Sequence, residues 1–172
     1  MVVVEAYAEF AREGTPSALT LLPRYPHLVV TRTMSKAFAM AGARIGYLAA
    51  APDVVEKLLL VRLPYHLSAV TQAVARAALA LAAEPLATVT KLRTERDGLV
   101  AWLRQRGLSV ADSDANFVLF GEFDSRRAVW QGLLDRGVLV REVGPPRWLR
   151  VTVGTPAEMA AFRAALDEVL SS

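Results

Sequence analysis

Short apolar runs and longer amphipathic stretches alternate along the chain. The first run, at 1–4, is apolar and rich in β-branched residues, which is typical of a buried strand. Similar runs predict further strands at 28–33, 45–49, 108–110, 117–120, 138–140 and 148–153. Stretches with helical spacing, many of them bounded by proline or glycine, predict helices at 17–22, 53–63, 68–83, 85–106, 125–135 and 156–170. Strands that alternate with helices in this way indicate an α/β fold.

Prolines indicate where the chain divides. Pro64 interrupts the pattern after the first three predicted strands, and Pro85 opens the longest predicted helix, with an Ala-rich helix between them. We therefore predict a first domain at 1–66, a linking helix at 67–84 and a second, α+β domain at 85–172.

Composition narrows the classes of protein. The chain has 172 residues, of which 53% are hydrophobic, with a formal net charge of +3 and no cysteine. That hydrophobic fraction supports a packed core, and the lack of cysteine excludes disulfides and thiolate metal sites. Basic and acidic residues are interspersed, without the basic stripe that favours nucleic-acid binding. No stretch has the length and character of a membrane span, and the start lacks the features of a signal peptide. We expect a cytoplasmic protein with no metal site that binds neither nucleic acid nor membrane.

The segment after the second predicted strand carries the densest set of candidate chemistry. Lys36 lies there between hydroxyl and small apolar residues, where partial burial would disfavour the ammonium form and leave a nucleophilic amine. Such an amine can attack an aldehyde and form an imine. Thr33 and Ser35 offer hydroxyl donors for a phosphate, and Arg44 offers a forked positive charge. Gly42 would permit a close approach or a positive φ. The alternative is a surface lysine beside Ser and Thr in a turn.

The whole segment favours the chemical interpretation. Residues 33–46 read T-M-S-K-A-F-A-M-A-G-A-R-I-G. This string resembles the lysine segment of fold-type I pyridoxal-phosphate aminotransferases, and above all that of histidinol-phosphate aminotransferases, T-x-S-K-A-F-x-x-A-G-x-R-x-G. The resemblance implies that Lys36 bears the cofactor and moves a proton between the substrate and the cofactor. It also implies that Thr33, Ser35 and Arg44 hold the cofactor phosphate.

The resemblance extends upstream, with one departure. Residues 5–10, E-A-Y-A-E-F, resemble the family's D-E-A-Y-x-E-F, in which the tyrosine contacts the phenolic oxygen of the cofactor. That role falls on Tyr7, whose alternative is an aromatic that packs on the core at a strand end. The family's Asp, which pairs with the pyridine nitrogen, is replaced by Val4. Glu5 points to the opposite strand face and is a poor substitute. We therefore expect weak cofactor binding and severely reduced transamination.

Downstream motifs add candidate substrate contacts. Residues 62–68, R-L-P-Y-H-L-S, resemble the linker after the family's large domain, which places Tyr65 at the substrate pocket or the dimer seam. Residues 149–155, L-R-V-T-V-G-T, resemble a family strand whose arginine binds the substrate carboxylate, and this arginine is Arg150. The resemblance assigns the substrate phosphate to Arg141 and, more weakly, a place near the substrate to Asn116. The alternative for either arginine is an exposed strand-edge side chain.

Together the motifs imply a fold and an activity. The resemblance spans only the second half of the family, so we expect the C-terminal part of a fold-type I pyridoxal-phosphate transferase. Residues 1–66 would end the sheet of the large cofactor-binding domain, and 85–172 would form the small C-terminal α+β domain. We expect a truncated chain with open edges at 1–4 and 28–33. The implied enzyme is a homodimer of histidine biosynthesis that exchanges an amino group between histidinol phosphate and 2-oxoglutarate or glutamate. An aromatic aminotransferase, a threonine-phosphate decarboxylase and a non-catalytic remnant remain open.

Overall fold

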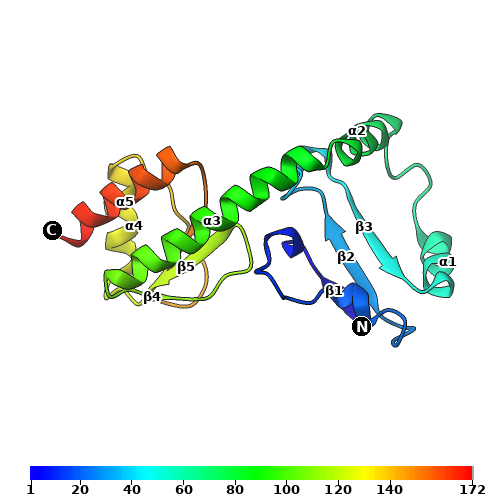
Figure 1. Ribbon diagram of the computed structural model, residues 1–172, viewed down its shortest axis with the longest axis horizontal. Helices are drawn as coiled ribbons and strands as arrows, with labels where there is room; N and C mark the ends of the chain where they lie inside the picture. The colour runs from blue at the N-terminus through cyan, green and yellow to red at the C-terminus, as the bar shows by residue number, and fades with distance from the viewer. Residues whose placement is uncertain (172) are drawn as a thin grey trace. The chain divides into compact units, whose positions relative to one another are not determined.

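The computed structural model describes residues 1–171, which fall into two compact units. The first unit is Met1–Val89 and the second is Thr90–Ser172. Figure 1 traces the chain from β1 near the N-terminus to α5 near the C-terminus. The predicted linking helix at 67–84 corresponds mainly to α2, which lies in the first unit. The domain boundaries suggested by the family resemblance stay a prediction.

The first unit is built on a mixed three-stranded sheet. Its strands are β1 (Val2–Val4), β2 (Val29–Thr33) and β3 (Gly46–Ala50), in the order β1-β2-β3. β1 runs parallel to β2, and β3 runs antiparallel to it. β2 is the central strand of the sheet, and Leu28, just before it, and Val30, within it, are buried.

The edges of this sheet differ from the sequence-based expectation. The segment 28–33 is not an open edge, because β1 and β3 pair with both sides of β2. The first strand is not buried as its apolar pattern predicted: Val2 is 62% exposed and Val4 is 71% exposed. The reason is its position, since β1 is an edge strand with one hydrogen-bonded neighbour.

Helices and turns connect and flank these strands. Three short 3₁₀ helices, η1 (Ala8–Phe10), η2 (Ala18–Leu21) and η3 (Ala41–Ala43), occupy the connections, and η2 replaces the helix predicted at 17–22. Two α-helices follow β3, namely α1 (Pro52–Val61) and α2 (Ala69–Ala80). α2 begins at a serine cap, where the Ser68 hydroxyl accepts a hydrogen bond from the Thr71 amide at 3.0 Å.

The long helix α3 (Ala83–Gln105) starts in the first unit and continues into the second (Figure 1). Pro85 was predicted to open this helix, but it occupies the third helical position. The first turn tolerates it, because the amides of a first helical turn have no intrahelical acceptor. The helix ends before Gly107, whose φ of 74° lies in the left-handed region that glycine adopts readily.

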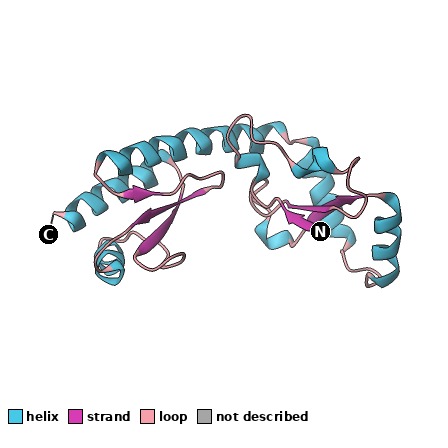
Figure 2. Cartoon of the chain, turned by 90° about the horizontal axis from the view of Figure 1, so that it is seen from below, coloured by secondary structure: helices cyan, strands magenta, loops and turns pink. Residues whose placement is uncertain are grey.

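The second unit packs helices on an antiparallel sheet. Its strands are β4 (Ser109–Val110), β5 (Phe117–Gly121) and β6 (Trp148–Thr152), in that order, and its further helices are α4 (Arg126–Asp135) and α5 (Pro156–Leu170) (Figure 2). The core of this unit includes fully buried side chains from each layer: Leu99, Leu103, Val118, Phe120, Leu133, Leu149 and Leu166.

The strand predicted at 138–140 is wrong. Val140 is buried and Leu139 is 77% exposed, so the side chains alternate as they would in a strand. The backbone makes only one isolated antiparallel bridge nearby, between Arg141 and Arg150. The segment is held instead by the Trp130 indole, which donates a hydrogen bond to the Val140 carbonyl oxygen at 2.9 Å.

Within residues 1–171, no single helix is both long and apolar enough to cross a membrane. Only α2 and α3 taken together meet that length and composition, across a bend of 69°.

Candidate functional site

The turn after β2 brings two predicted phosphate ligands together. The Thr33 hydroxyl donates a hydrogen bond to the Ser35 hydroxyl oxygen at 2.9 Å, and the Ser35 amide donates one to the Thr33 hydroxyl oxygen at 3.1 Å. Such local side-chain bonds are what Ser and Thr favour where a strand ends. The result is a pair of adjacent hydroxyls at the start of the turn that carries the candidate lysine.

Lys36 and Tyr7 lie close together although 29 positions separate them in the sequence. The Lys36 Nζ atom is 5.8 Å from the centre of the Tyr7 ring. That distance falls within the range of a cation–π contact. The Tyr7 ring also meets the ring of buried Phe10 edge-on at 6.5 Å. Tyr7 therefore packs against a core residue and also lies beside the lysine, while its contact with the cofactor stays a prediction.

The expected desolvation of the lysine amine is not present. Lys36 is exposed, whereas its neighbours Met34 and Ala37 are 3% and 6% exposed. The turn thus directs the apolar neighbours into the first unit and leaves the lysine on its surface. Residues of the first unit alone do not shield the Lys36 amine from water.

Arg44 occupies an unusual backbone conformation. Its φ is 50° and its ψ is 46°, which is the left-handed region that non-glycine residues seldom adopt. Its guanidinium is exposed, and Nη1 donates a hydrogen bond to the Ala41 carbonyl oxygen at 3.2 Å. The charge is therefore anchored locally and accessible to an anion.

The close backbone approach expected at Gly42 lies instead at Gly46. Gly42 has no positive φ, and nothing lies within 4 Å of the position that a Cβ atom would take. At Gly46 a Cβ atom would stand 2.5 Å from the Arg32 carbonyl oxygen, because β3 pairs with β2 there and leaves no room for a side chain. The second glycine therefore sets the spacing of the strands beside the lysine turn.

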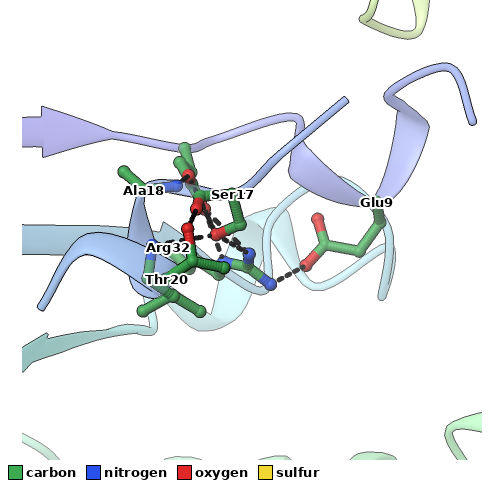
Figure 3. Close-up of polar contacts among 7 residues, drawn as sticks. Glu9, Ser17, Ala18, Thr20 and Arg32 are labelled. Atoms are coloured by element: carbon green, nitrogen blue, oxygen red, sulfur yellow. Dashed lines mark hydrogen bonds and ion pairs between the residues drawn. The ribbon is translucent and has the colours of Figure 1, made fainter. Parts of the chain in front are cut away.

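A polar cluster ties the start of this unit to β2. Glu5 accepts hydrogen bonds from Arg32 Nη2 at 2.8 Å, from the Ser17 hydroxyl at 2.8 Å and from the Ala18 amide at 2.6 Å. Figure 3 shows Arg32 between Ser17 on one side and Glu9 on the other. The side chains of Glu5 and Arg32 are only 13% and 18% exposed. The cluster is therefore a largely buried ion pair in which the Glu5 carboxylate oxygens accept several hydrogen bonds.

The electrostatics of the cluster follow from these contacts. Burial acts to raise the pKa of Glu5, but hydrogen bonds from the Ala18 amide, Arg32 and Ser17 outweigh it and hold the pKa below its ordinary value. Burial acts to lower the pKa of Arg32, and the bonds with Glu5 and Tyr47 reverse that effect and raise it. Both groups are thus charged in the folded protein at neutral pH.

The cluster also bears on the departure at Val4. The Val4 side chain is 71% exposed at the strand edge and has no group that could pair with a pyridine nitrogen. The Glu5 carboxylate is committed to Arg32, Ser17 and Ala18. The neighbouring acid therefore does not replace the family's aspartate.

A largely apolar groove of about 490 Å³ borders the cluster within the first unit. Its lining includes Glu9 and Arg32, Ile45 just before β3, Tyr47 of β3, and Ala75 and Leu79 of α2. Tyr65 is not among its lining residues: it is 98% exposed in the loop after α1, with a φ of 52°.

In the second unit, Arg150 has the features of an anion ligand. It lies on β6 between the buried side chains of Leu149 and Val151, and its guanidinium lies 4.7 Å from the centre of the Phe117 ring. Its Nε atom is buried and has no hydrogen-bond partner among the described residues. A buried donor without an acceptor is costly, and an anionic ligand would satisfy it.

Two further candidates lie near Arg150 in the same unit. Arg141 is exposed and pairs with Arg150 through two backbone hydrogen bonds of 2.9 Å each. Asn116 is half-buried, and its carbonyl oxygen accepts a hydrogen bond from the Val153 amide at 2.9 Å. The candidate cofactor ligands therefore belong to the first unit, and the arginine pair with Asn116 belongs to the second.

Some members of the site were not predicted from the sequence. The sequence motifs assign no role to Glu9 and Arg32, and they present Glu5 only as a poor substitute for the absent aspartate. The ion pair joins residues 27 positions apart, so no local motif announces it. The one available signal was the placement of two acidic residues symmetrically about Tyr7. Within residues 1–171, no group of three or more His, Cys, Asp or Glu side chains could hold a metal ion.

Comparisons with known proteins show the family to which this chain belongs. The family model for aminotransferase class I and II matches residues 1–166. Histidinol-phosphate aminotransferase of Thermobifida fusca (strain YX) is 72% identical over 166 residues, which are 96% of this chain and 45% of that protein. Histidinol-phosphate aminotransferase 3 of Burkholderia lata is 65% identical over 171 residues, which are 99% of this chain and 46% of that protein. The chain thus spans less than half the length of these curated relatives.

Solved structures confirm the predicted fold class. The crystal structure of histidinol-phosphate aminotransferase from Sinorhizobium meliloti in complex with pyridoxal-5'-phosphate superposes with a TM-score of 0.86 at 31% identity, covering 99% of this chain and 48% of that chain. L-threonine-O-3-phosphate decarboxylase from Porphyromonas gingivalis has a TM-score of 0.84 at 22% identity, which shows a shared fold.

Proposed function

Because the chain belongs to the class I and II aminotransferases, we propose that it contributes to a pyridoxal-phosphate enzyme acting on amino acids and keto acids. The more specific proposal is amino transfer between histidinol phosphate and the 2-oxoglutarate/glutamate pair, in histidine biosynthesis. The observation that carries it is the match with the Thermobifida fusca enzyme at 72% identity, which includes the Lys36 turn. Several curated relatives with that name are 54% to 72% identical to this chain, so an aromatic aminotransferase or a decarboxylase is not favoured.

Some side chains of the first unit are suited to bind pyridoxal phosphate. When bound, pyridoxal phosphate supplies an electron-withdrawing ring that stabilises negative charge at the substrate carbon. Lys36 would hold it covalently, and its amine would move a proton at the substrate Cα atom. Tyr7, whose ring centre lies 5.8 Å from that amine, would donate a hydrogen bond to the phenolic oxygen of the ring.

Anion binding is divided among several cationic and hydroxyl groups. The adjacent Thr33 and Ser35 hydroxyls and the exposed Arg44 guanidinium would hold the cofactor phosphate. In the second unit, Arg150, whose Nε atom has no partner among residues 1–171, would bind the substrate carboxylate, and Arg141 would bind the substrate phosphate. The family resemblance also suggests substrate contacts for Asn116 of the second unit and, separately, for Tyr65 of the first.

A second proposal is favoured by Val4. Without an acid at this position the ring nitrogen would not be held protonated, and the electron withdrawal would be weak. Binding with little turnover is therefore the expected behaviour of this chain.

The phosphorylated substrate supports a cytoplasmic enzyme, and we propose a homodimer as the assembly.

Cofactor attachment is the first test. The full chain is incubated with pyridoxal phosphate and reduced with borohydride, and the adduct is mapped among its three lysines, Lys36, Lys57 and Lys91. We expect adduct mainly at Lys36, and none there in Lys36→Ala. Equal labelling of all three lysines, which are all exposed, would contradict the proposed cofactor site.

Turnover is the second test. The chain is mixed with the portion of the Thermobifida fusca relative that it does not match, and amino transfer from histidinol phosphate to 2-oxoglutarate is measured. We expect weak activity that rises with Val4→Asp, because the acid restores a partner for the ring nitrogen. If Val4→Asp brings no gain while Lys36 is labelled, the non-catalytic binding proposal is favoured.

A further inference from the structure

We propose that Arg32 is a positioning residue that fixes Tyr7 beside Lys36 by holding the two carboxylates that flank the tyrosine. Glu5 and Glu9 lie two positions before and two positions after Tyr7. Both side chains pair with the same guanidinium. The inference rests on the proposed function, in which Tyr7 and Lys36 face the cofactor.

The backbone leaves the sheet just before the tyrosine. The Glu5 amide donates a hydrogen bond to the Thr31 carbonyl oxygen at 2.9 Å, and this bond continues the parallel pairing of β1 with β2. The next backbone bonds run within the turn: the Ala8 amide to the Glu5 carbonyl at 3.5 Å and the Phe10 amide to the Tyr7 carbonyl at 2.9 Å. Side chains must therefore supply much of what keeps this turn against β2.

Arg32 supplies that connection through all three of its side-chain nitrogens. Nε and Nη2 donate to Glu5 Oε2 at 3.1 and 2.8 Å, and Nη1 lies 3.7 Å from Glu9 Oε1 (Figure 3). The Glu5, Glu9 and Arg32 side chains are 13%, 14% and 18% exposed. Charge pairs at such depth are screened far less by salt and water than pairs at the surface.

The carboxylate of Glu5 is itself braced from a third side. The Ser17 hydroxyl and the Ala18 amide, at the start of η2, donate to it at 2.8 and 2.6 Å. Ser17 also accepts a hydrogen bond from Arg32 Nη2 at 3.0 Å. The Arg32 guanidinium therefore pairs with a Glu5 carboxylate that is already held in place. Because the same guanidinium also pairs with Glu9, it fixes the position of the turn that carries Glu9.

Arg32 and Lys36 belong to one continuous piece of chain. Arg32 lies on β2 between buried Val30 and buried Met34, and Lys36 follows two residues after Met34. A displacement of the guanidinium from the two carboxylates would move the Tyr7 turn relative to this piece. Lysine could not replace it, because a single ammonium lacks the planar fork that reaches two carboxylates at fixed angles.

The first experiment does not depend on the cofactor. In the full chain, the NOE between the Tyr7 ring protons and the Lys36 side chain is recorded, together with the ring-current shift of the Lys36 methylene groups. We expect Arg32→Lys and Arg32→Gln to abolish the NOE and to move the shifts toward random-coil values. Glu9→Gln, which removes only the 3.7 Å pair, should reduce both effects in part.

A matched control comes from the second unit. Arg163 pairs with Glu95 at 2.6 Å, with side chains that are 25% and 22% exposed. Arg163→Lys should leave the Tyr7–Lys36 NOE unchanged. Retention of the full NOE in Arg32→Gln, with the amide shifts of β2 intact, would overturn the inference. If Arg32→Gln does not fold, Arg32→Lys and Glu9→Gln decide the question by the same criterion.

A second measurement separates this inference from the proposed function. The rate of pyridoxal-phosphate labelling at Lys36 relative to Lys57 and Lys91 should fall about threefold or more in Arg32→Lys, and this loss should vanish in a Tyr7→Ala background. An equal loss in both backgrounds would show that Arg32 does not act through Tyr7. Unselective labelling of the unaltered chain would overturn the proposed function, while the NOE comparison would still decide the role of Arg32.

Discussion

Gly46 lies so close to Arg32 that a Cβ atom on the glycine would stand 2.5 Å from the arginine carbonyl oxygen. We therefore expect Gly46→Ala to push β3 away from β2 and to lower the free energy of unfolding by about 1–3 kcal/mol, the usual cost of overpacking. Amide hydrogen exchange in β2 measures this loss locally. The same variant should also show less pyridoxal-phosphate labelling at Lys36, because the displaced part of β2 ends three residues before the lysine.

Gly42→Ala is the control for that prediction. Nothing lies within 4 Å of the added methyl group, so its effect should stay within roughly 0.5 kcal/mol. If the two alanine variants are equally stable, the backbone approach at Gly46 does not constrain the strands as described.

Acid should weaken the cluster around Glu5. Its pKa is held below the ordinary value, so its charged form stabilises the fold at neutral pH, and this contribution is lost as the pH falls through the lowered pKa. We expect Glu5→Gln to destabilise the first unit by roughly 1–3 kcal/mol at pH 7, since Arg32 loses its charged partner. Amide exchange in β1 and β2, recorded from pH 7 down to pH 3, should show the two proteins converging below about pH 4. A difference that stays constant over this range would contradict the assigned pKa.

The aromatic core of the second unit offers a clean stability test. Phe120 is fully buried and meets the rings of Phe123 and Phe162 edge-on at 5.7 and 5.6 Å. Phe120→Ala should cost about 3–5 kcal/mol, through lost burial and the remaining cavity. All three tryptophans belong to this unit, so their fluorescence in urea reports its unfolding directly. Leu139→Ala, at a residue that is 77% exposed, should leave the midpoint nearly unchanged.

The two arginines at the β6 bridge should affect different parts of the substrate. The test uses this chain mixed with the unmatched portion of the Thermobifida fusca relative. In that mixture, Arg150→Lys should raise the KM for every amino substrate about tenfold or more, because a charged hydrogen bond to the substrate carboxylate is lost. Arg141→Met should raise the KM for histidinol phosphate and spare substrates without a phosphate. Equal effects of Arg141→Met on both classes would contradict its assignment to the phosphate.

The cofactor role of the lysine turn could be predicted because its residues are local. Thr33, Ser35 and Lys36 lie within four positions, and the whole segment 33–46 resembles a family motif. The role of each residue stays a prediction. The ion pair of Glu5 with Arg32 was not readable, since 27 positions separate the partners and only the register of β1 on β2 brings them together.

Two errors in the fold share a physical cause. The run 138–140 alternates like a strand, with Val140 inward and Leu139 outward, yet within residues 1–171 it belongs to no strand. The exposed β1 has the composition of a buried strand but lies at a sheet edge. Apolar pattern reports which side chains prefer burial, whereas pairing depends on which backbone lies alongside.

Arg44 carries a consequence for anyone who would engineer this chain. An arginine held at a φ of 50° costs about 1–2 kcal/mol in backbone strain that a glycine would avoid. Substitution by glycine would therefore raise thermal tolerance while it removed the guanidinium proposed to bind the cofactor phosphate. Stability and the proposed activity therefore favour different residues at this position. A search for stable variants that selects on melting temperature alone would favour replacing the arginine and losing its charge.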